Sequence, residues 1–338
     1  MTASPFDVPS EPEELFHHPD RNLAMELVRA TEAAAIRSVP WIGKGDKLAA
    51  DGAAVDAMRK FLNTVNFDGV VVIGEGEKDE APMLHNGEHV GTGRGPLCDI
   101  AVDPIDGTSL TAAGKQNAIS TIAVSDRGTM LDVSSVFYME KMVAGPEAVG
   151  VLDLNLPIGE NLRLLAKAKG VDVSDLLVAV LDRPRHEQLI QDIRAAGAGT
   201  RLLRDGDVAG GINAARYQSR IDLCVGIGGS PEGIVTACAV KALGGFIQGR
   251  LAPSSDAERQ KAIDAGLPLD TVLSAEDMVK GDNTFFVATG VTDGELLDGV
   301  RRKGPIIRTE SMVLRARSGT IRRVSADHLV SKWLPESD

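Results

Sequence analysis

The stretch Cys98–Thr111, CDIAVDPIDGTSLT, constrains the fold of this chain more than any other. Its apolar run Ile100–Val102 ends at Asp103. Pro104 follows, and because proline has no backbone N–H it is confined to the ends, edges or bulges of strands. A second acid, Asp106, comes just before a glycine. This order predicts a strand that ends near its first acid, a sharp turn, and the start of a helix.

The two acids and the residues after them suggest a site for metal and phosphate. Asp103 and Asp106 would lie together at the end of a strand, where paired carboxylates can hold a hard divalent cation. Gly107 would let the backbone amides of Thr108 and Ser109, at the start of the predicted helix, approach a phosphate closely. An acid before glycine is also ordinary turn chemistry. The combination of apolar strand, intervening proline and Gly-Thr is much more specific.

Two more acids stand beside predicted elements. Asp51 precedes an amphipathic helix predicted over Gly52–Leu62, a position where an Asp is commonly just an N-cap. Glu75 follows a predicted buried strand, Gly69–Ile73, in the same way that Asp103 follows its own strand. Glu75 is therefore a candidate ligand, although a lone Glu in a loop is more often simply solvated.

The remaining pattern predicts strands and helices along the whole chain. We expect residues 1–20 to form a flexible tail and a helix to begin at Asp20. Further predicted strands are 118–124, 130–137, 139–143, 176–181, 221–225, 284–288 and 320–324, and further helices are 157–169, 183–193, 234–243 and much of 254–282. These elements favour an α/β fold of sheets layered with helices. We expect a lobe of residues 21–170 and a lobe of residues 171–338 that together form one catalytic unit.

Composition excludes several classes of function. The net charge of −12 argues against general binding to nucleic acid or to an anionic membrane surface. No run of eighteen apolar residues is present that could cross a membrane. The three cysteines are scattered without a C-x-x-C pair, which indicates neither a zinc cluster nor a disulfide framework and fits a reducing, cytoplasmic setting.

Two glycine-rich segments imitate nucleotide-binding motifs. Gly226–Gly228 follows a predicted strand, but Pro231 occupies the third position of the dinucleotide fingerprint. Gly107 and Gly114 are separated by six residues where a P-loop has four, and Gln116 stands where a P-loop has Ser or Thr. The sequence therefore supports neither a dehydrogenase nor a P-loop kinase.

The acidic motifs resemble those of a known group of enzymes. Asp103–Thr108, preceded by Gly74–Glu77, is similar to the metal signature of the lithium-sensitive phosphatase superfamily, which includes inositol monophosphatases and fructose-1,6-bisphosphatases. Within that group the chain resembles the class II fructose-1,6-bisphosphatases of bacteria from about Arg21 to Trp333. The segments that carry this closer resemblance are GDKLAADGAAVDAMR (Gly45–Arg59), VVIGEGEKDEAPML (Val71–Leu84), RPRH (Arg183–His186), DGDVA (Asp205–Ala209) and GIGGSPEG (Gly226–Gly233).

The resemblance implies an αβαβα sandwich and a role for each matching residue. Carboxylates of the family bind Mg²⁺ or Mn²⁺, and they match Asp51, Glu75, Asp103, Asp106 and Glu232. Catalysis would fall to Thr108, whose hydroxyl would orient the attacking water, with Asp51 and Glu75. The sugar phosphate would be bound by Asp106, Gly107, Thr108, Ser109, Tyr138, Arg183, Pro184, Arg185, Asp205, Gly206, Asp207 and Gly229. Some relatives carry Glu where Asp106 stands, which affects the geometry of the metal site.

The resemblance also implies an activity. We expect metal-dependent hydrolysis of the 1-phosphate of fructose 1,6-bisphosphate, in gluconeogenesis, by a homo-oligomer that is a dimer or a tetramer. Carboxylates suit Mg²⁺ or Mn²⁺, which prefer oxygen ligands. A sedoheptulose 1,7-bisphosphatase and an inositol or nucleotide monophosphatase are alternatives, because the metal half of the site is common to all of them. A non-catalytic sugar-phosphate sensor is less favoured, because Thr108 and the full set of acids are intact.

Overall fold

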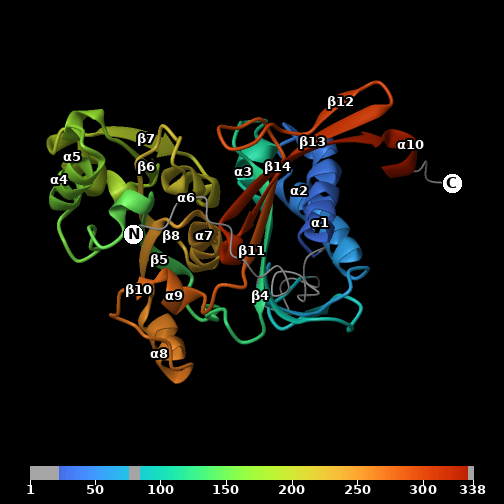
Figure 1. The fold of residues 1–338 in the computed structure, drawn as a ribbon, viewed down its shortest axis with the longest axis horizontal. Helices are drawn as coiled ribbons and strands as arrows, with labels where there is room; N and C mark the ends of the chain where they lie inside the picture. Colours follow the sequence, from blue (N-terminus) through green and yellow to red (C-terminus); the bar gives the residue numbers. More distant parts are fainter. Residues whose placement is uncertain (1–22, 76–83, 334–338) are drawn as a thin grey trace, which may run out of the picture.

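The computed structural model describes residues 23–75 and 84–333. These residues form two β-sheets with helices against both faces of each, stacked as alternating layers (Figure 1). The helices are α1 (Leu23–Ser38), α2 (Lys47–Leu62), α3 (Thr108–Ala112), α4 (Ile158–Lys169), α5 (Glu187–Ala195), α6 (Asp207–Ala215), α7 (Ser230–Leu243), α8 (Asp256–Asp264), α9 (Ala275–Met278) and α10 (Val330–Trp333). The predicted tail, residues 1–20, lies outside the described residues.

The first sheet has the strand order β12-β13-β11-β4-β3-β1-β2, with β14 paired to β13. Its strands are β1 (Asp68–Ile73), β2 (His89–Val90), β3 (Leu97–Asp106), β4 (Ile119–Asp126), β11 (Phe285–Gly290), β12 (Arg301–Lys303), β13 (Ile306–Arg315) and β14 (Thr320–Leu329). The chain thus returns to this sheet after completing the second one. The predicted division into a lobe of residues 21–170 and a lobe of residues 171–338 stays a prediction.

The second sheet has the strand order β10-β9-β5-β8-β6-β7. Its strands are β5 (Tyr138–Ala144), β6 (Leu177–Leu181), β7 (Gly199–Leu203), β8 (Leu223–Gly229), β9 (Phe246–Leu251) and β10 (Leu273–Ser274). Helices α1 and α2 pack on the outer face of the first sheet, α6 and α7 lie between the two sheets, and α4 and α5 flank the second (Figure 1). The predicted αβαβα sandwich is therefore confirmed.

Helix α7 is the centre of the core because it packs on both sheets. From Gly233 to Val240 every residue of this helix is buried, and the small side chains at Ala237 and Ala239 let the sheets approach it from two sides. The N-terminal end of the helix faces the cavity described below and carries Glu232. The packing of α7 in the core thus also holds Glu232, one of the predicted metal ligands, in position.

The strand predicted over residues 130–137 is wrong. Within this segment only Met130 forms a β-bridge, with Val279. The backbone then turns where Asp132 Oδ1 accepts the N–H of Ser134 at 2.9 Å. Local side-chain bonding of this kind competes with strand pairing. Met130, Val133 and Val136 are buried without forming a strand, whereas Phe137 is exposed.

The predicted end of the central strand is also wrong. Strand β3 continues to Asp106, although its pairing with β4 is irregular between Asp103 and Asp106. Pro104 lies within this irregularity, where its missing N–H removes no regular ladder bond.

Helix α2 begins at Lys47 and not at Gly52. Asp46 is its N-cap and accepts the N–H of Ala49 at 2.9 Å. Asp51 therefore lies inside the helix, and the N-cap interpretation of this acid is wrong. The helix predicted over much of residues 254–282 is likewise reduced to α8 and α9, with the short strand β10 between them.

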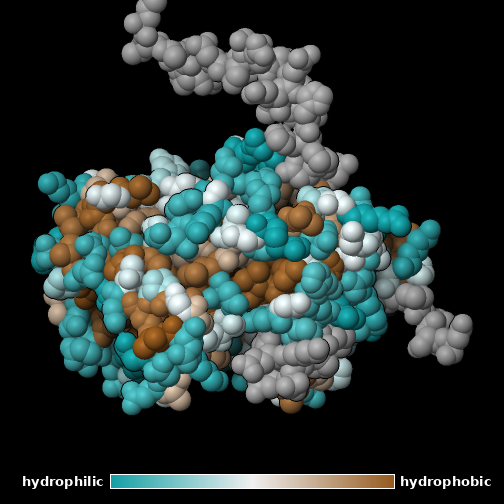
Figure 2. Space-filling model, turned by 90° about the horizontal axis from the view of Figure 1, so that it is seen from below, coloured by the Kyte–Doolittle hydropathy of each residue, from teal (hydrophilic) through white to brown (hydrophobic). Residues whose placement is uncertain are grey.

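The surface of the molecule is mixed in character. The face in Figure 2 shows hydrophobic groups interspersed with hydrophilic ones. Among the described residues, we find no helix with the length and apolar character that a membrane crossing requires.

Candidate active site

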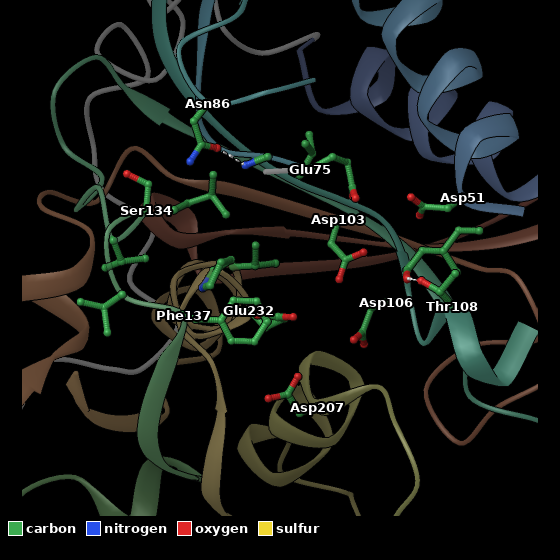
Figure 3. Close-up of a pocket in the computed structure, with 18 of the residues that line it drawn as sticks. Asp51, Glu75, Asn86, Asp103, Asp106, Thr108, Ser134, Phe137, Asp207 and Glu232 are labelled. Atoms are coloured by element: carbon green, nitrogen blue, oxygen red, sulfur yellow. Dashed lines mark hydrogen bonds between the residues drawn. The ribbon is translucent and has the colours of Figure 1, made fainter. Parts of the chain in front are cut away.

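One cavity of about 840 Å³, called the acidic cavity below, contains most of the predicted site residues (Figure 3). The predicted residues that line it are Asp51, Glu75, Asp103, Asp106, Gly107, Thr108, Asp205, Asp207 and Glu232. They come from strand β3 of the first sheet, from the segments after β1 and before α6, and from helices α2, α3, α6 and α7. Gly76 and Glu77 of the sequence motif lie outside the described residues.

Parallel pairing brings two of the acidic segments together. Strands β1 and β3 are parallel neighbours, with Val71 opposite Ile100. The ends of parallel neighbours lie at the same edge of a sheet, so Glu75, just beyond β1, lies near the acids at the end of β3. Figure 3 shows Asp51 approaching this edge from α2.

The irregular end of β3 explains why both of its acids can serve one site. In a regular strand, residues three positions apart face opposite sides of the sheet. Between Asp103 and Asp106 the pairing with β4 shifts register, and both side chains line the acidic cavity. A bulge re-aims side chains in this way. The proline of the motif therefore helps to bring its two carboxylates to one face.

Burial and mutual repulsion dominate the electrostatics of these carboxylates. Burial, together with the charges of Asp51 and Glu232, raises the pKa of Glu75 to about 8. Burial also raises the pKa of Asp103 and of Asp106 well above the ordinary value, with neighbouring acids adding to the effect. The pKa values of Asp51 and Glu232 are raised mainly by burial too. With a pKa of about 8, Glu75 of the metal-free protein holds a proton at neutral pH, where a glutamate is ordinarily ionised.

These residues fit a hard divalent cation by their chemistry. The donor atoms are carboxylate oxygens, and Glu232 Oε2 is buried without a hydrogen-bond partner among the described residues. Within residues 23–75 and 84–333, no three His, Cys, Asp or Glu side chains are close enough together to hold one ion. Binding would therefore require the repelling carboxylates to turn toward the ion. A bound cation would offset the repulsion among the ionised carboxylates.

Gly229 makes room for Glu232. A Cβ atom at position 229 would lie 1.7 Å from Glu232 Oε2, so any side chain there would displace this carboxylate. The adjacent Gly228 has a similar role, because its Cβ would lie 2.1 Å from Asp207 Oδ2. Both positions at the end of β8 thus require glycine, because a side chain there would collide with the carboxylate of Asp207 or of Glu232.

Lys141 is a residue that sequence reasoning missed. Its Nζ donates to Asp207 Oδ2 at 2.6 Å and to the carbonyl of Gly229 at 2.9 Å. Burial lowers the pKa of Lys141, but the nearby Asp207 charge outweighs this effect and the pKa is raised. A single lysine inside the apolar strand β5 was the available signal, since a buried lysine needs an acidic partner.

Three hydrogen bonds tie strand β3 and helix α3 to α6 and the turn before it. Asp106 Oδ2 accepts the N–H of Ala209 at 3.1 Å. Asp205 Oδ2 accepts the N–H of Ser109 at 3.3 Å and also the Ser109 hydroxyl. Gly206, between Asp205 and Asp207, has φ 78°, the left-handed conformation that glycine adopts without strain.

Thr108 is the first residue of α3 and lines the acidic cavity. Its Oγ1 donates to the carbonyl of Ile105 at 3.0 Å (Figure 3). Because the hydroxyl hydrogen is used in this bond, the oxygen has acceptor capacity to offer to a group in the cavity.

Seven of the predicted residues lie outside the lining of the acidic cavity. Arg183 Nη1 donates to the carbonyl of Arg204 at 2.8 Å, and its Nη2 lies 3.8 Å from Asp205 Oδ1. Arg185 donates to the carbonyl of Ile227 through Nε at 3.0 Å and through Nη2 at 2.8 Å. The Arg185 guanidinium also lies 5.0 Å from the ring centroid of Tyr138. These seven residues are Ser109, Tyr138, Arg183, Pro184, Arg185, Gly206 and Gly229. Ser109, Arg183 and Gly229 each contact a residue that lines the cavity.

Part of the cavity lining was not predicted. It includes Lys47 at the start of α2, residues 133–137, and Lys261 on α8. Glu258 of α8 links this helix to residues 133–137 by accepting the backbone N–H of Phe137. Residues 133–137 and Lys261 lie in none of the motifs above, and Lys47, although part of the Gly45–Arg59 segment, was not singled out.

Comparisons with known proteins agree with this geometry. A family model described as "Bacterial fructose-1,6-bisphosphatase, glpX-encoded" matches residues 21–328. "Fructose-1,6-bisphosphatase 1 class 2" of Escherichia coli (strain K12) is 46% identical over 331 residues, which cover 94% of this chain and 98% of that protein. "Fructose-1,6-bisphosphatase class 2" of Shigella flexneri matches with the same identity and coverage. The chain therefore belongs to the class 2 family of bacterial fructose-1,6-bisphosphatases.

Proposed function

We propose that this protein hydrolyses the 1-phosphate of fructose 1,6-bisphosphate to give fructose 6-phosphate and inorganic phosphate, with Mg²⁺ or Mn²⁺, in gluconeogenesis. The observation that carries the proposal is the gathering of Asp51, Glu75, Asp103, Asp106 and Glu232 around one cavity. The two relatives described above carry the name of this activity. We further propose that the protein acts in the cytoplasm as a homo-oligomer.

The carboxylates would hold the metal, which when bound would lower the pKa of water and neutralise charge on the phosphoryl oxygens. The Thr108 Oγ1 atom would accept a hydrogen bond from the attacking water, because its own hydrogen is donated to the carbonyl of Ile105. Asp51 would take the proton as a general base. Glu75, with its raised pKa, supports this role by contributing a hydrogen bond to the Asp51 carboxylate.

The sugar would lie between the metal ligands and the second sheet. Asp205 and Asp207 line the acidic cavity, and the hydrogen bonds described above use Oδ2 of each. Each therefore retains a second oxygen that can accept a hydrogen bond from a sugar hydroxyl. Arg183 and Arg185 would bind the remote phosphate, since a guanidinium matches the geometry of phosphate.

Binding by these arginines requires that they leave their present partners. Arg185 is held by the carbonyl of Ile227 and by the ring of Tyr138. Both contacts are to neutral groups, and a phosphate would bind the guanidinium more strongly than either. Substrate binding would thus pull Arg185 toward the cavity.

The experiment that tests the proposed substrate compares phosphate release from fructose 1,6-bisphosphate, sedoheptulose 1,7-bisphosphate, fructose 6-phosphate and inositol 1-phosphate. We expect kcat/KM for fructose 1,6-bisphosphate to be the highest, because the remote phosphate positions the reacting one. Arg185→Ala should remove most of the preference over fructose 6-phosphate, whereas Arg163→Ala, on the exposed face of α4, should not. Equal kcat/KM for monophosphates and bisphosphates would overturn the assignment.

A further inference from the structure

His186 ends the RPRH segment and, unlike Arg185 before it, is buried, with an exposed fraction of 1%. Its Nδ1 lies 2.7 Å from the carbonyl oxygen of Leu181, and its Nε2 accepts the backbone N–H of Ile227 at 2.8 Å. A carbonyl can only accept, so the ring hydrogen is on Nδ1 and the free lone pair is on Nε2. Burial, together with the charges of Arg185 and Arg183, lowers the pKa of His186. The ring is therefore neutral at pH 7, and its tautomer is fixed.

The ring bridges two strands of the second sheet at the point where they separate. Strands β6 and β8 are parallel, and their pairing ends with Ala179 opposite Cys224. Further along, the imidazole stands between Leu181, at the end of β6, and Ile227 of β8, in place of a direct bond between the strands. Paired strands lie about 4.8 Å apart, which leaves no room for a ring, so the strands must diverge here. The carboxyl ends of such strands are where α/β sheets bind ligands.

Gly226 leaves the space that the ring occupies. Its φ of 132° is a conformation that residues with a side chain rarely adopt. A Cβ atom at this position would lie 2.9 Å from His186 Nε2 and would push the ring away from Ile227. Gly226 belongs to the GIGGSPEG segment and His186 to the RPRH segment. These two sequence motifs therefore meet in one contact.

The contacts of His186 also hold the turn that carries Arg185. Residues Pro184–His186 form one 3-10 turn, so a ring that is bound at both nitrogens fixes the backbone of the residue before it. The Arg185 guanidinium contacts the same strand residue, because it donates to the carbonyl of Ile227. When a phosphate takes the place of this carbonyl, only the arginine side chain has to move. A backbone that is fixed before binding reduces the entropy lost when the ligand binds.

We infer that His186 is a positioning residue for the remote phosphate of the substrate: its neutral ring, accepting at Nε2, holds the turn of Arg183 and Arg185 at the opened edge of the second sheet. The inference rests on the role proposed above for these arginines. Loss of the ring therefore weakens recognition of a bisphosphate. It leaves the reaction at the metal ligands unchanged, because His186 is not among the described residues that line the acidic cavity.

Glutamine and asparagine separate the two contacts of the ring. His186→Gln can bring its amide oxygen to the place of Nε2 and accept the Ile227 N–H, whereas His186→Asn reaches only the place of Nδ1 and can bond only to Leu181. For His186→Asn we expect KM for fructose 1,6-bisphosphate to rise by about ten- to hundredfold, the effect of one lost charge-assisted contact. Hydrolysis of 4-nitrophenyl phosphate, which has no remote phosphate, should be unchanged. His186→Gln should keep most of the wild-type KM, and His89→Asn, at an exposed histidine of β2, is the matched control and should follow the wild type.

Two further measurements do not depend on the substrate. Amide hydrogen exchange at Ile227 should be faster in His186→Asn than in the wild type and close to normal in His186→Gln. Nitrogen-15 NMR of the histidine rings of the wild type at pH 7 should place the His186 hydrogen on Nδ1, a result that stands even if a variant does not fold. A hydrogen on Nε2, or unchanged exchange at Ile227 in His186→Asn, would overturn the inference.

The kinetic outcomes separate this inference from the proposed function. Equal losses for both substrates in His186→Asn would show a merely structural role and overturn the inference. If His186→Asn leaves the preference for the bisphosphate unaltered while Arg185→Ala removes it, the inference alone fails. If neither substitution alters the preference, the role proposed for the arginines fails with it.

Discussion

Glu75→Gln should stabilise the metal-free protein at alkaline pH. Burial and the charges of Asp51 and Glu232 raise the pKa of Glu75 from 4.5 to about 8. Between these pH values the folded protein holds a proton that the unfolded chain has released, so the free energy of unfolding falls as the pH rises. A pKa difference of this size corresponds to a loss of at most about 5 kcal/mol in the free energy of unfolding. The figure is an upper limit because the carboxylates of the cavity titrate together.

The assay is urea unfolding in the presence of a chelator from pH 5 to pH 8.5. The wild type should lose stability across this range, and Glu75→Gln should lose less, so that the variant is the more stable protein at pH 8. Added Mg²⁺ or Mn²⁺ should reverse the order, because the metal stabilises only the protein that retains its ligand. Glu160→Gln, on the exposed surface of α4, should follow the wild type. A variant that loses stability as steeply as the wild type would refute the reasoning.

Three further substitutions test other parts of the site. Thr108→Ala should lower turnover by about 10²–10⁴-fold while Thr108→Ser keeps part of it; near-normal turnover with a lower Tm would show a purely structural role. Gly229→Ala should weaken metal affinity, measured by Mn²⁺ activation, because the new Cβ would lie 1.7 Å from Glu232 Oε2; unchanged affinity would show that this carboxylate is free to move. Lys141→Met should cost about 3–5 kcal/mol in urea unfolding, because it leaves Asp207 as a buried, unpaired charge; a smaller loss would show that water reaches this acid.

The acidic residues could be found from the sequence because each follows a local pattern. Asp103 directly follows the apolar run Ile100–Val102, and Glu75 comes two residues after the run Gly69–Ile73. Parallel pairing of the two strands then brings both acids to one edge of the sheet. Asp51 and Glu232 carry no such signal, since an acid near a helix start is ordinary. Their assignment came from resemblance to a family, and the structure places both in the same cavity as the others.

Elements whose pattern depends on tertiary contacts could not be predicted. Strand β13 was missed because polar residues occupy its inward positions; Thr309 donates to Glu32 of α1 at 2.9 Å, and Ser311 lies 2.8 Å from Thr289. Such buried polar pairs erase the apolar alternation by which a strand is recognised.

Helix α6 was missed because glycines disfavour helices in isolation. In the structure they are required by close packing. A Cβ at Gly210 would lie 2.5 Å from the Leu203 side chain, and one at Gly211 would lie 2.8 Å from that of Thr236. Tertiary packing between two sheets thus overrides the local preference of this segment.

The most direct test of the account is phosphate release from fructose 1,6-bisphosphate by the purified protein with Mg²⁺ or Mn²⁺, with chelator, and after Asp103→Asn. The account predicts release with metal, none with chelator, and none from a variant that still unfolds cooperatively in urea. This follows because Asp103 is buried beside the other acids of the cavity and is proposed to bind metal. Undiminished release by Asp103→Asn, or by the wild type in chelator, would contradict it.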